Sequence, residues 1–376
     1  MRRERLIGGL VVGALVLAAC GSDDDGGSSA SMEDAVVTYA DGVYASYDAS
    51  LASAATMDEA IDAFVADPTE DTLAAAKTAW LDARADYGPT EAFRFYGGPI
   101  DNEEDGPEGL INAWPMDEAY VDYVEGNADA GIINDPDTYP TIDGALLESL
   151  NESGGESNIS TGWHAIEFLL WGQDLSDDGP GARPASDYAD APNADRRAVY
   201  LTTASELLLG HLQDLADAWS PDGDNYRAEF LAMEPADAMT NIITGIGELS
   251  RGELAGERMN VAYVERSQED EHSCFSDNTT ADIAGNARGI QMVLTADYPG
   301  AAGGTSVLDI IRAEDEALAD ELEAQVQASV VAVEAIPAPF DQHLAEGVPD
   351  SDPGRASILA GIEALEAQTP TMVSAA

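Results

Sequence analysis

The sequence predicts an all-helical fold in which two helical bundles pack together. Apolar residues recur at spacings of three and four through long Ala-rich stretches, which is the pattern of amphipathic helices. Alternation of apolar and polar residues at period two, which is typical of strands, is scarce. Because clusters of Pro, Gly and Asp interrupt the helical pattern, the chain is expected to form many separate helices.

The expected helices follow from this spacing and from the capping residues between them. Asp67 and Pro68 predict the start of the second helix, since Asp is a favoured cap and Pro fits the first turn. The Asp- and Gly-rich stretch 176–193 is the widest break, so the bundles are expected to span residues 32–191 and 192–376. In chain order the expected helices are 32–66, 69–87, 117–125, 143–150, 161–171, 195–219, 235–259, 280–296, 314–336 and 355–368.

The N-terminus has the pattern of a bacterial lipoprotein signal. Three arginines precede the apolar run 6–19, which ends in Leu-Ala-Ala directly before Cys20. This run is too short to cross a ~30 Å hydrocarbon core. We therefore expect a signal peptide at 1–19, lipidation of Cys20 and a flexible tether at 20–31. The mature protein is expected outside the cytoplasm, lipid-anchored to the cell membrane and facing the periplasm or the cell surface.

The charge of the chain excludes one class of partner. There are 72 Asp and Glu against 16 Lys and Arg, which gives a formal net charge of −56. Such a chain repels phosphate, so nucleic acid is not an expected partner. Cys274 has no cysteine to pair with once Cys20 carries lipid, so it is expected to be a small buried residue or a metal ligand.

One segment stands apart from the acidic helices around it. Residues 161–174 are apolar on nearly every side, and their only titratable members are His164, Glu167 and Asp174. A helix that is apolar all round lies in the interior, so His164 and Glu167 are expected to be buried. A spacing of three places both side chains on one helix face, where they can neutralise each other as a structural pair or hold one cation together.

Several segments of the chain resemble the imelysin family. Residues 162–167 match its Gly-x-His-x-x-Glu signature, residues 93–102 resemble its first block, and residues 256–278 resemble its iron-regulated protein A-like branch. The resemblance implies an all-helical, two-bundle, extracytoplasmic protein involved in bacterial iron acquisition, with the signature at the junction of the bundles. Some members of the family have been described as metallopeptidases, and others as metal-binding proteins of iron-uptake systems.

The candidate metal site follows from the signature and from the other two blocks. Imidazole and carboxylate together suit iron, and zinc is the second candidate. Arginines near the acids are expected to balance carboxylates or to bind an anionic chelator. The expected ligands are His164, Glu167, Glu91, Asp101 and His272. The residues expected to surround them or to contact a bound ligand are Arg94, Arg258, Glu271, Asp277 and Trp163, for which a polar network between the bundles is the structural alternative.

Three functions remain open from the sequence. The favoured one is capture of iron or of an iron chelate, with an iron transporter as a candidate partner. The second is a metal-dependent peptidase, although Phe168 occupies the last position of a His-x-x-Glu-His zinc motif and breaks it. The third is a scaffold or binding module without metal.

Overall fold

The computed structural model describes residues 30–176, 179–301, 303–345 and 347–376 and confirms the all-helical fold. Within these residues the only strand-like feature is an isolated bridge between Val124 and Asn127. The expected signal peptide, the lipidation site Cys20 and the tether as far as residue 29 lie outside the described residues.

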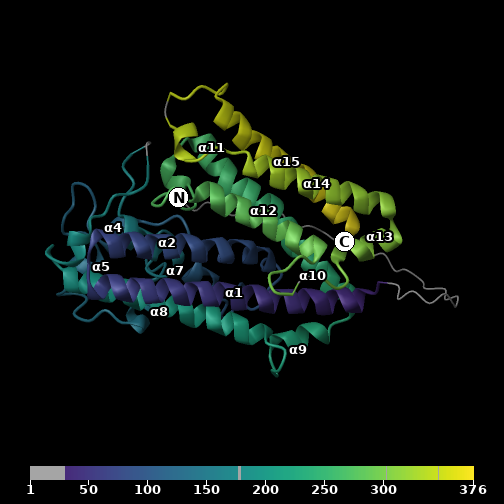
Figure 1. Ribbon diagram of the computed structural model, residues 1–376, viewed down its shortest axis with the longest axis horizontal. Coiled ribbons are helices and arrows are strands. Elements are labelled where there is room, and N and C mark those ends of the chain that lie inside the picture. Colours follow the sequence, from purple (N-terminus) through teal and green to yellow (C-terminus); the bar gives the residue numbers. More distant parts are fainter. Residues whose placement is uncertain (1–29, 177–178, 302, 346) are drawn as a thin grey trace.

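Four helices from the first 219 residues form the first bundle. α1 and α2 pack along each other, and α8 lies on the other side of α1 (Figure 1). Ser31 and Thr69 cap α1 and α2 by accepting backbone N–H bonds. The cap expected at Asp67 is wrong, because Asp67 ends α1 and Pro68 lies before the first turn of α2. The helices are α1 (Met32–Ala66), α2 (Glu70–Tyr87), α7 (Gly162–Trp171) and α8 (Ala194–Trp219).

The position of α8 differs from the expected division of the chain at residue 192. α8 packs against α1 and α7, so it belongs by contact with the helices that precede the break at 176–193. A buried ion-pair cluster holds it there. Arg197 on α8 bonds to both carboxylate oxygens of Asp122 at 2.6 and 2.8 Å, and Arg183 bonds to the same Asp122 at 2.7 Å. The Pro-rich break is therefore a connection within the first bundle.

The second bundle follows α8. A π-helix, η3, continues α10 without a break, and together they cover the single helix expected at 235–259. Asp315 interrupts the helical path expected at 314–336, because it leaves helical geometry and caps the next helix through two backbone N–H groups. The elements are α10 (Pro235–Glu248), η3 (Leu249–Asn260), α12 (Thr279–Thr295), α13 (Val307–Glu314), α14 (Glu316–Glu334) and α15 (Pro353–Ala375).

Short helical turns connect the long helices. Most were not expected, since one or two turns are too short to show an apolar period. They are η1 (Gly88–Phe93), α3 (Glu108–Ile111), α4 (Glu118–Val121), α5 (Gly131–Asn134), α6 (Gly144–Leu150), η2 (Ala185–Tyr188), α9 (Tyr226–Leu231), α11 (Val261–Glu265), η4 (Gln268–Asp270) and η5 (Asp341–His343).

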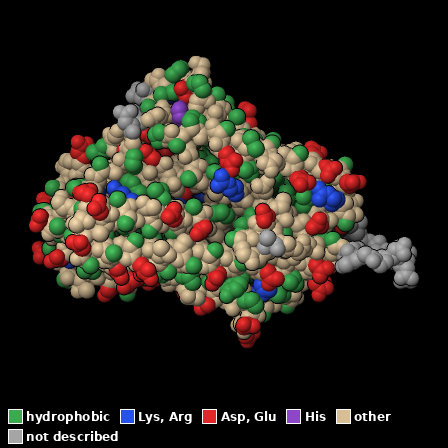
Figure 2. All heavy atoms as spheres, in the orientation of Figure 1, with side chains coloured by type: hydrophobic (Ala, Val, Ile, Leu, Met, Phe, Trp, Pro, Cys, Tyr) green, Lys and Arg blue, Asp and Glu red, His purple; other side chains and the backbone are tan. Residues whose placement is uncertain are grey.

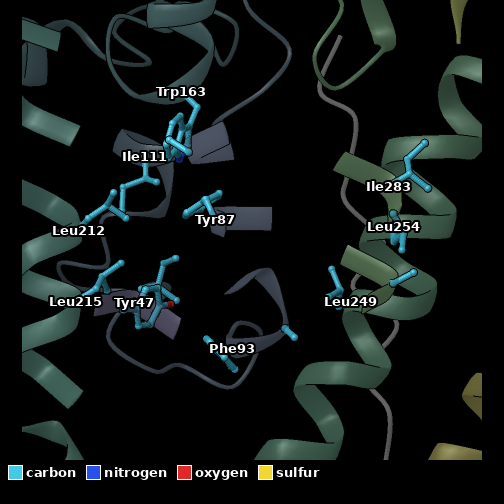
Figure 3. Packing of buried hydrophobic residues seen from close by; sticks show 14 of the residues in the cluster. Tyr47, Tyr87, Phe93, Ile111, Trp163, Leu212, Leu215, Leu249, Leu254 and Ile283 are labelled. Carbon is cyan, nitrogen blue, oxygen red and sulfur yellow. The ribbon is translucent and has the colours of Figure 1, made fainter. Parts of the chain in front are cut away.

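The two bundles meet along η1 and α12. Their backbones approach so closely that a Cβ on Gly289 of α12 would lie 2.3 Å from the carbonyl oxygen of Pro89 in η1. Buried apolar side chains continue across this junction, with Tyr87 and Trp163 on one side and Leu254 and Ile283 on the other (Figure 3). The close contact brings the polar residues of η1 and α12 into one buried region.

The surface carries the net negative charge of the chain. Figure 2 shows acidic side chains spread over the whole visible face, with few Lys or Arg between them. In the part of the chain that the structure describes, none of the helices combines the length and the hydropathy needed to span a membrane.

The Asp122 cluster leads to a first prediction. Asp122→Ala leaves the buried guanidinium of Arg197 without a carboxylate and leaves Arg183 with only Asp187, 3.3 Å away. The free energy of unfolding should therefore fall by about 3–5 kcal/mol. Urea denaturation of both proteins measures this change. Asp137→Ala, at an exposed position, is the control and should stay within about 0.5 kcal/mol of the wild type. Equal effects of the two substitutions would contradict the assigned role of Asp122.

Candidate functional site

The signature helix α7 lies in the interior, as its sequence predicted. All ten of its residues are buried. Gly162 begins the helix at φ +80°, and a Cβ there would lie 2.3 Å from the carbonyl oxygen of Ile111. Only glycine fits both the backbone angle and the close approach. The glycine of the signature therefore places the helix, and with it His164, against the α3 segment.

His164 and Glu167 form the expected pair. Nδ1 of His164 lies 2.9 Å from Oε2 of Glu167. The other carboxyl oxygen of Glu167 accepts hydrogen bonds from the backbone N–H and the hydroxyl of Ser276, at 2.9 and 2.7 Å. Ser276 precedes α12, so this single carboxyl group connects the signature helix to the second half of the chain.

Burial makes the pair electrically neutral. His164 is 1% exposed and Glu167 is 0% exposed. Burial raises the pKa of Glu167 to about 8. Burial, together with the nearby His272 and Arg84, lowers the pKa of His164 well below its usual value. Near pH 7 the structure therefore favours a protonated Glu167 and an uncharged imidazole.

A second imidazole reaches the pair from the other half of the chain. The ring centroids of His164 and His272 are 4.7 Å apart. Nδ1 of His272 lies 3.0 Å from Oδ2 of Asp282, and burial lowers the pKa of His272 to about 4. Asp282 is held in turn by the guanidinium of Arg84, with Nε and Nη2 each 3.1 Å from a carboxylate oxygen. This ion pair keeps the pKa of Asp282 well below its usual range.

Among the described residues, one ring nitrogen at the centre of this arrangement forms no hydrogen bond. Nε2 of His164 is buried and has no hydrogen-bond partner among the described residues. The ring of Trp114 lies 4.7 Å from the His164 ring, measured between centroids. Because buried polar atoms are nearly always satisfied, this nitrogen is the atom of the site most open to a ligand.

Glu91 lies at the same junction but in a different electrostatic environment. Its Oε2 accepts hydrogen bonds from Arg94 at 2.7 Å and from Arg258 at 2.6 Å, and these charges hold its pKa well below the usual range. Asn112 connects the two clusters, since it donates to Glu91 and accepts from Arg84. The arginines therefore balance carboxylates, which was one of the two roles expected from the sequence.

Two further expected residues contact groups other than the imidazole pair of His164 and His272. Asp101 accepts a hydrogen bond from the backbone N–H of Phe95, in the loop that follows η1. Trp163 packs against Trp80 and Tyr87, with ring centroids 6.1 and 5.4 Å apart.

The contacts of Cys274, Glu271 and Asp277 likewise involve groups other than the imidazole pair. Cys274 is buried, and burial raises the pKa of its thiol. Glu271 is buried close to Asp277, whose charge acts on it, and Asp277 lies beside Asp174 and Asp341.

Two central residues were missed from the sequence. Arg84 and Asp282 both lie on the buried faces of helices that were themselves expected, at 69–87 and 280–296. A charged residue on the apolar face of a predicted helix needs a buried partner. This signal was present, but the sequence does not reveal which opposite charge across the junction is the partner.

Comparison with known proteins identifies the chain. The sequence profile of the imelysin family matches residues 43–372. The chain belongs to the imelysin family. It is 25% identical over 340 residues to iron-regulated protein A of Synechococcus elongatus, and the match covers 88% of this chain and 81% of that protein.

Two crystal structures of similar fold agree with this membership. One is an iron-regulated protein A precursor from Parabacteroides distasonis, with a TM-score of 0.70, 20% identity and coverage of 92% of this chain and 93% of that one. The other is an imelysin-like protein from Psychrobacter arcticum, with a TM-score of 0.61, 14% identity and coverage of 90% and 92%. At these identities the likeness concerns the fold of this imelysin-family chain.

The raised pKa of Glu167 leads to a prediction about stability and pH. The unfolded chain loses this proton near its ordinary pKa of about 4.5, whereas the folded chain keeps it until about pH 8. Wild-type stability should therefore fall with rising pH in this window relative to Glu167→Gln, by up to ~1.4 kcal/mol per pH unit. The glutamine keeps an acceptor for Ser276 and mimics the protonated acid. Urea denaturation in EDTA-containing buffer at pH 5 to 8 measures the difference.

A matched control separates this effect from other titrations. Glu265→Gln changes a carboxyl group that is exposed on α11 and should follow the wild type at every pH. A constant difference between wild type and Glu167→Gln from pH 5 to 8 would show that Glu167 is ionised in the folded protein at all of these pH values.

Proposed function

We propose that this imelysin-family protein captures iron, outside the cytoplasm, at the junction of its two bundles. The observation that carries the proposal is the buried imidazole pair of His164 and His272, in which each Nδ1 is held by a carboxyl group. This arrangement fixes the ring orientation and leaves Nε2 of His164 available. Histidines held in this way by a carboxylate are typical of metal sites in proteins. The name of the Synechococcus relative, iron-regulated protein A, supports an iron-related role.

The contacts favour three of the expected residues as ligands. His164 and His272 supply imidazole nitrogen, and Glu167 supplies a carboxyl group that must lose its proton to bind or to support a cation. Imidazole with carboxylate suits iron and also zinc, so both metals belong in the test. We leave Glu91 and Asp101 out of the proposed ligand set, because two arginines already bind Glu91 and a backbone N–H group binds Asp101.

The charge around Glu91 favours a cation over an anionic chelate. Arg94 and Arg258 are the positive groups of this cluster, and each is paired with Glu91. Glu108 and Glu253 also pair with these arginines. Three carboxylates therefore surround two guanidinium groups, which leaves no unbalanced positive charge for citrate or a similar anion.

The cellular setting remains part of the proposal. The lipoprotein signal that ends directly before Cys20 supports an anchor in the outer leaflet of the cell membrane, with the folded bundles in the aqueous space beyond it. A protein that captures iron in that position has to pass it on, which makes an iron transporter the expected partner.

Metal titration tests the function. Purified, EDTA-treated protein is titrated with ferrous, ferric and zinc ions under chelator control, and heat and melting temperature are recorded. At a free iron concentration 100 times the Kd, the wild type should gain about 2.7 kcal/mol of stability. His164→Ala and Glu167→Ala should lose this gain. His211→Ala changes a half-buried histidine of α8 that pairs with Glu148, and should keep it.

Other outcomes identify the alternatives. Hydrolysis of a protein substrate that disappears in His164→Ala would favour a metal-dependent peptidase. A wild type that gains no stability from any metal, together with a lower melting temperature of His164→Ala, would favour a scaffold in which His164 and Glu167 are a structural pair.

A further inference from the structure

Three aspartates meet in one cluster, although they come from distant parts of the sequence. Asp174 follows the signature helix α7, Asp277 precedes α12, and Asp341 begins η5. One carboxylate oxygen from each of them lies within 4.8 Å of the other two. The cluster therefore joins the first bundle to two separate segments of the second half of the chain.

The spacing of these oxygens fits one calcium ion. Ca²⁺ binds oxygen at about 2.4 Å, so two ligands on opposite sides of the ion are ~4.8 Å apart. All three carboxylates can therefore contact a single Ca²⁺ without large movement. Mg²⁺ binds at about 2.1 Å and requires nearly ideal octahedral geometry, so it fits less easily.

A fourth acid points independently to a bound cation. Glu271 is only 2% exposed, and its Oε2 accepts a hydrogen bond from the hydroxyl of Thr279 at 2.9 Å. Its Oε1 is buried and has no hydrogen-bond partner among the described residues. The charged groups that act on Glu271 are the three aspartates themselves. A buried carboxyl oxygen without a donor, close to three other acids, is stabilised if a cation lies among them.

Neutral donors orient Asp174 within the cluster. The side-chain amide of Gln268 and the backbone N–H of Ser176 both donate to the carboxylate of Asp174. Within the described residues, neither Glu271 nor Asp277 forms an ion pair with Arg or Lys. Neutral donors fix the position of a carboxylate but do not compensate its charge. Burial and the neighbouring aspartates raise the pKa of Glu271, and burial raises the pKa of Asp277 to about 6. A cation bound among these acids would stabilise their ionised forms.

We propose that the three aspartates form a calcium site next to the buried Glu271, separate from the iron site. Its oxygen-only donors select a hard divalent cation, whereas the imidazoles of the iron site select a transition metal. The ion ties the loop after α7 to the segments before α12 and at η5. Those segments also carry His272 and Ser276, so calcium holds in place two groups that contact the signature helix.

Calcium titration of the purified, EDTA-treated protein tests this site. The wild type in 150 mM salt should bind one Ca²⁺ by calorimetry, and its melting temperature should rise at millimolar calcium. Asp277→Asn and Asp341→Asn should lose this rise. Because each substitution also removes repulsion between carboxylates, both variants should melt at or above the wild-type temperature in calcium-free buffer. A loss of calcium response through misfolding would instead lower that temperature.

Three controls separate this site from general attraction of cations and from the iron site. Asp224→Asn removes an exposed acid and should keep the full response to calcium. His164→Ala should also keep it, and in calcium-free buffer Asp277→Asn should respond to iron as the wild type does. The proposal is overturned if the wild type does not respond to millimolar calcium, if Asp224→Asn loses as much as Asp277→Asn, or if Mg²⁺ at equal concentration matches Ca²⁺.

Discussion

The ion pair between Arg84 and Asp282 holds the centre of the molecule together. Arg84 comes from α2 and Asp282 from α12, so the pair crosses the junction between the two bundles. Removing one member of such a buried pair typically costs about 3–5 kcal/mol, because the other charge stays in the interior without a partner. Asp282 also orients His272, and Arg84 reaches Glu91 through Asn112. The geometry of the candidate site is thus a consequence of how the bundles are joined.

The chain has few basic residues, and many of them lie in the interior. The chain has 16 Lys and Arg against 72 acids, and yet much of its positive charge lies inside, while the acids cover the surface (Figure 2). Each buried arginine holds a carboxylate or a backbone carbonyl group, so the interior is close to neutral where arginine is present. The buried arginines among the described residues are Arg84, Arg94, Arg183, Arg197, Arg227, Arg258 and Arg355.

Local signals in the sequence predicted much of the fold, and long-range pairing explains what they missed. The spacing of apolar residues and the caps predicted most long helices within a turn, although α15 continues to Ala375, seven residues beyond its expected end. The apolar surroundings of His164 and Glu167 predicted their burial. The position of α8 could not be predicted, because it depends on Asp122 reaching Arg197 across 75 positions of sequence. The site shows the same limit. Glu91 was an expected metal ligand, but in the structure it pairs with Arg94 and Arg258.

The proton on Glu167 has a consequence for any ion that enters beside it. A carboxyl group that keeps its proton up to about pH 8 has to release it before it can face a positive charge. Uptake of a cation at His164 is then an exchange in which one H⁺ leaves, and its equilibrium shifts about tenfold for each unit by which the surroundings become more acidic. If a cation binds beside Glu167 as proposed, acidification would therefore release it without requiring a change in the fold.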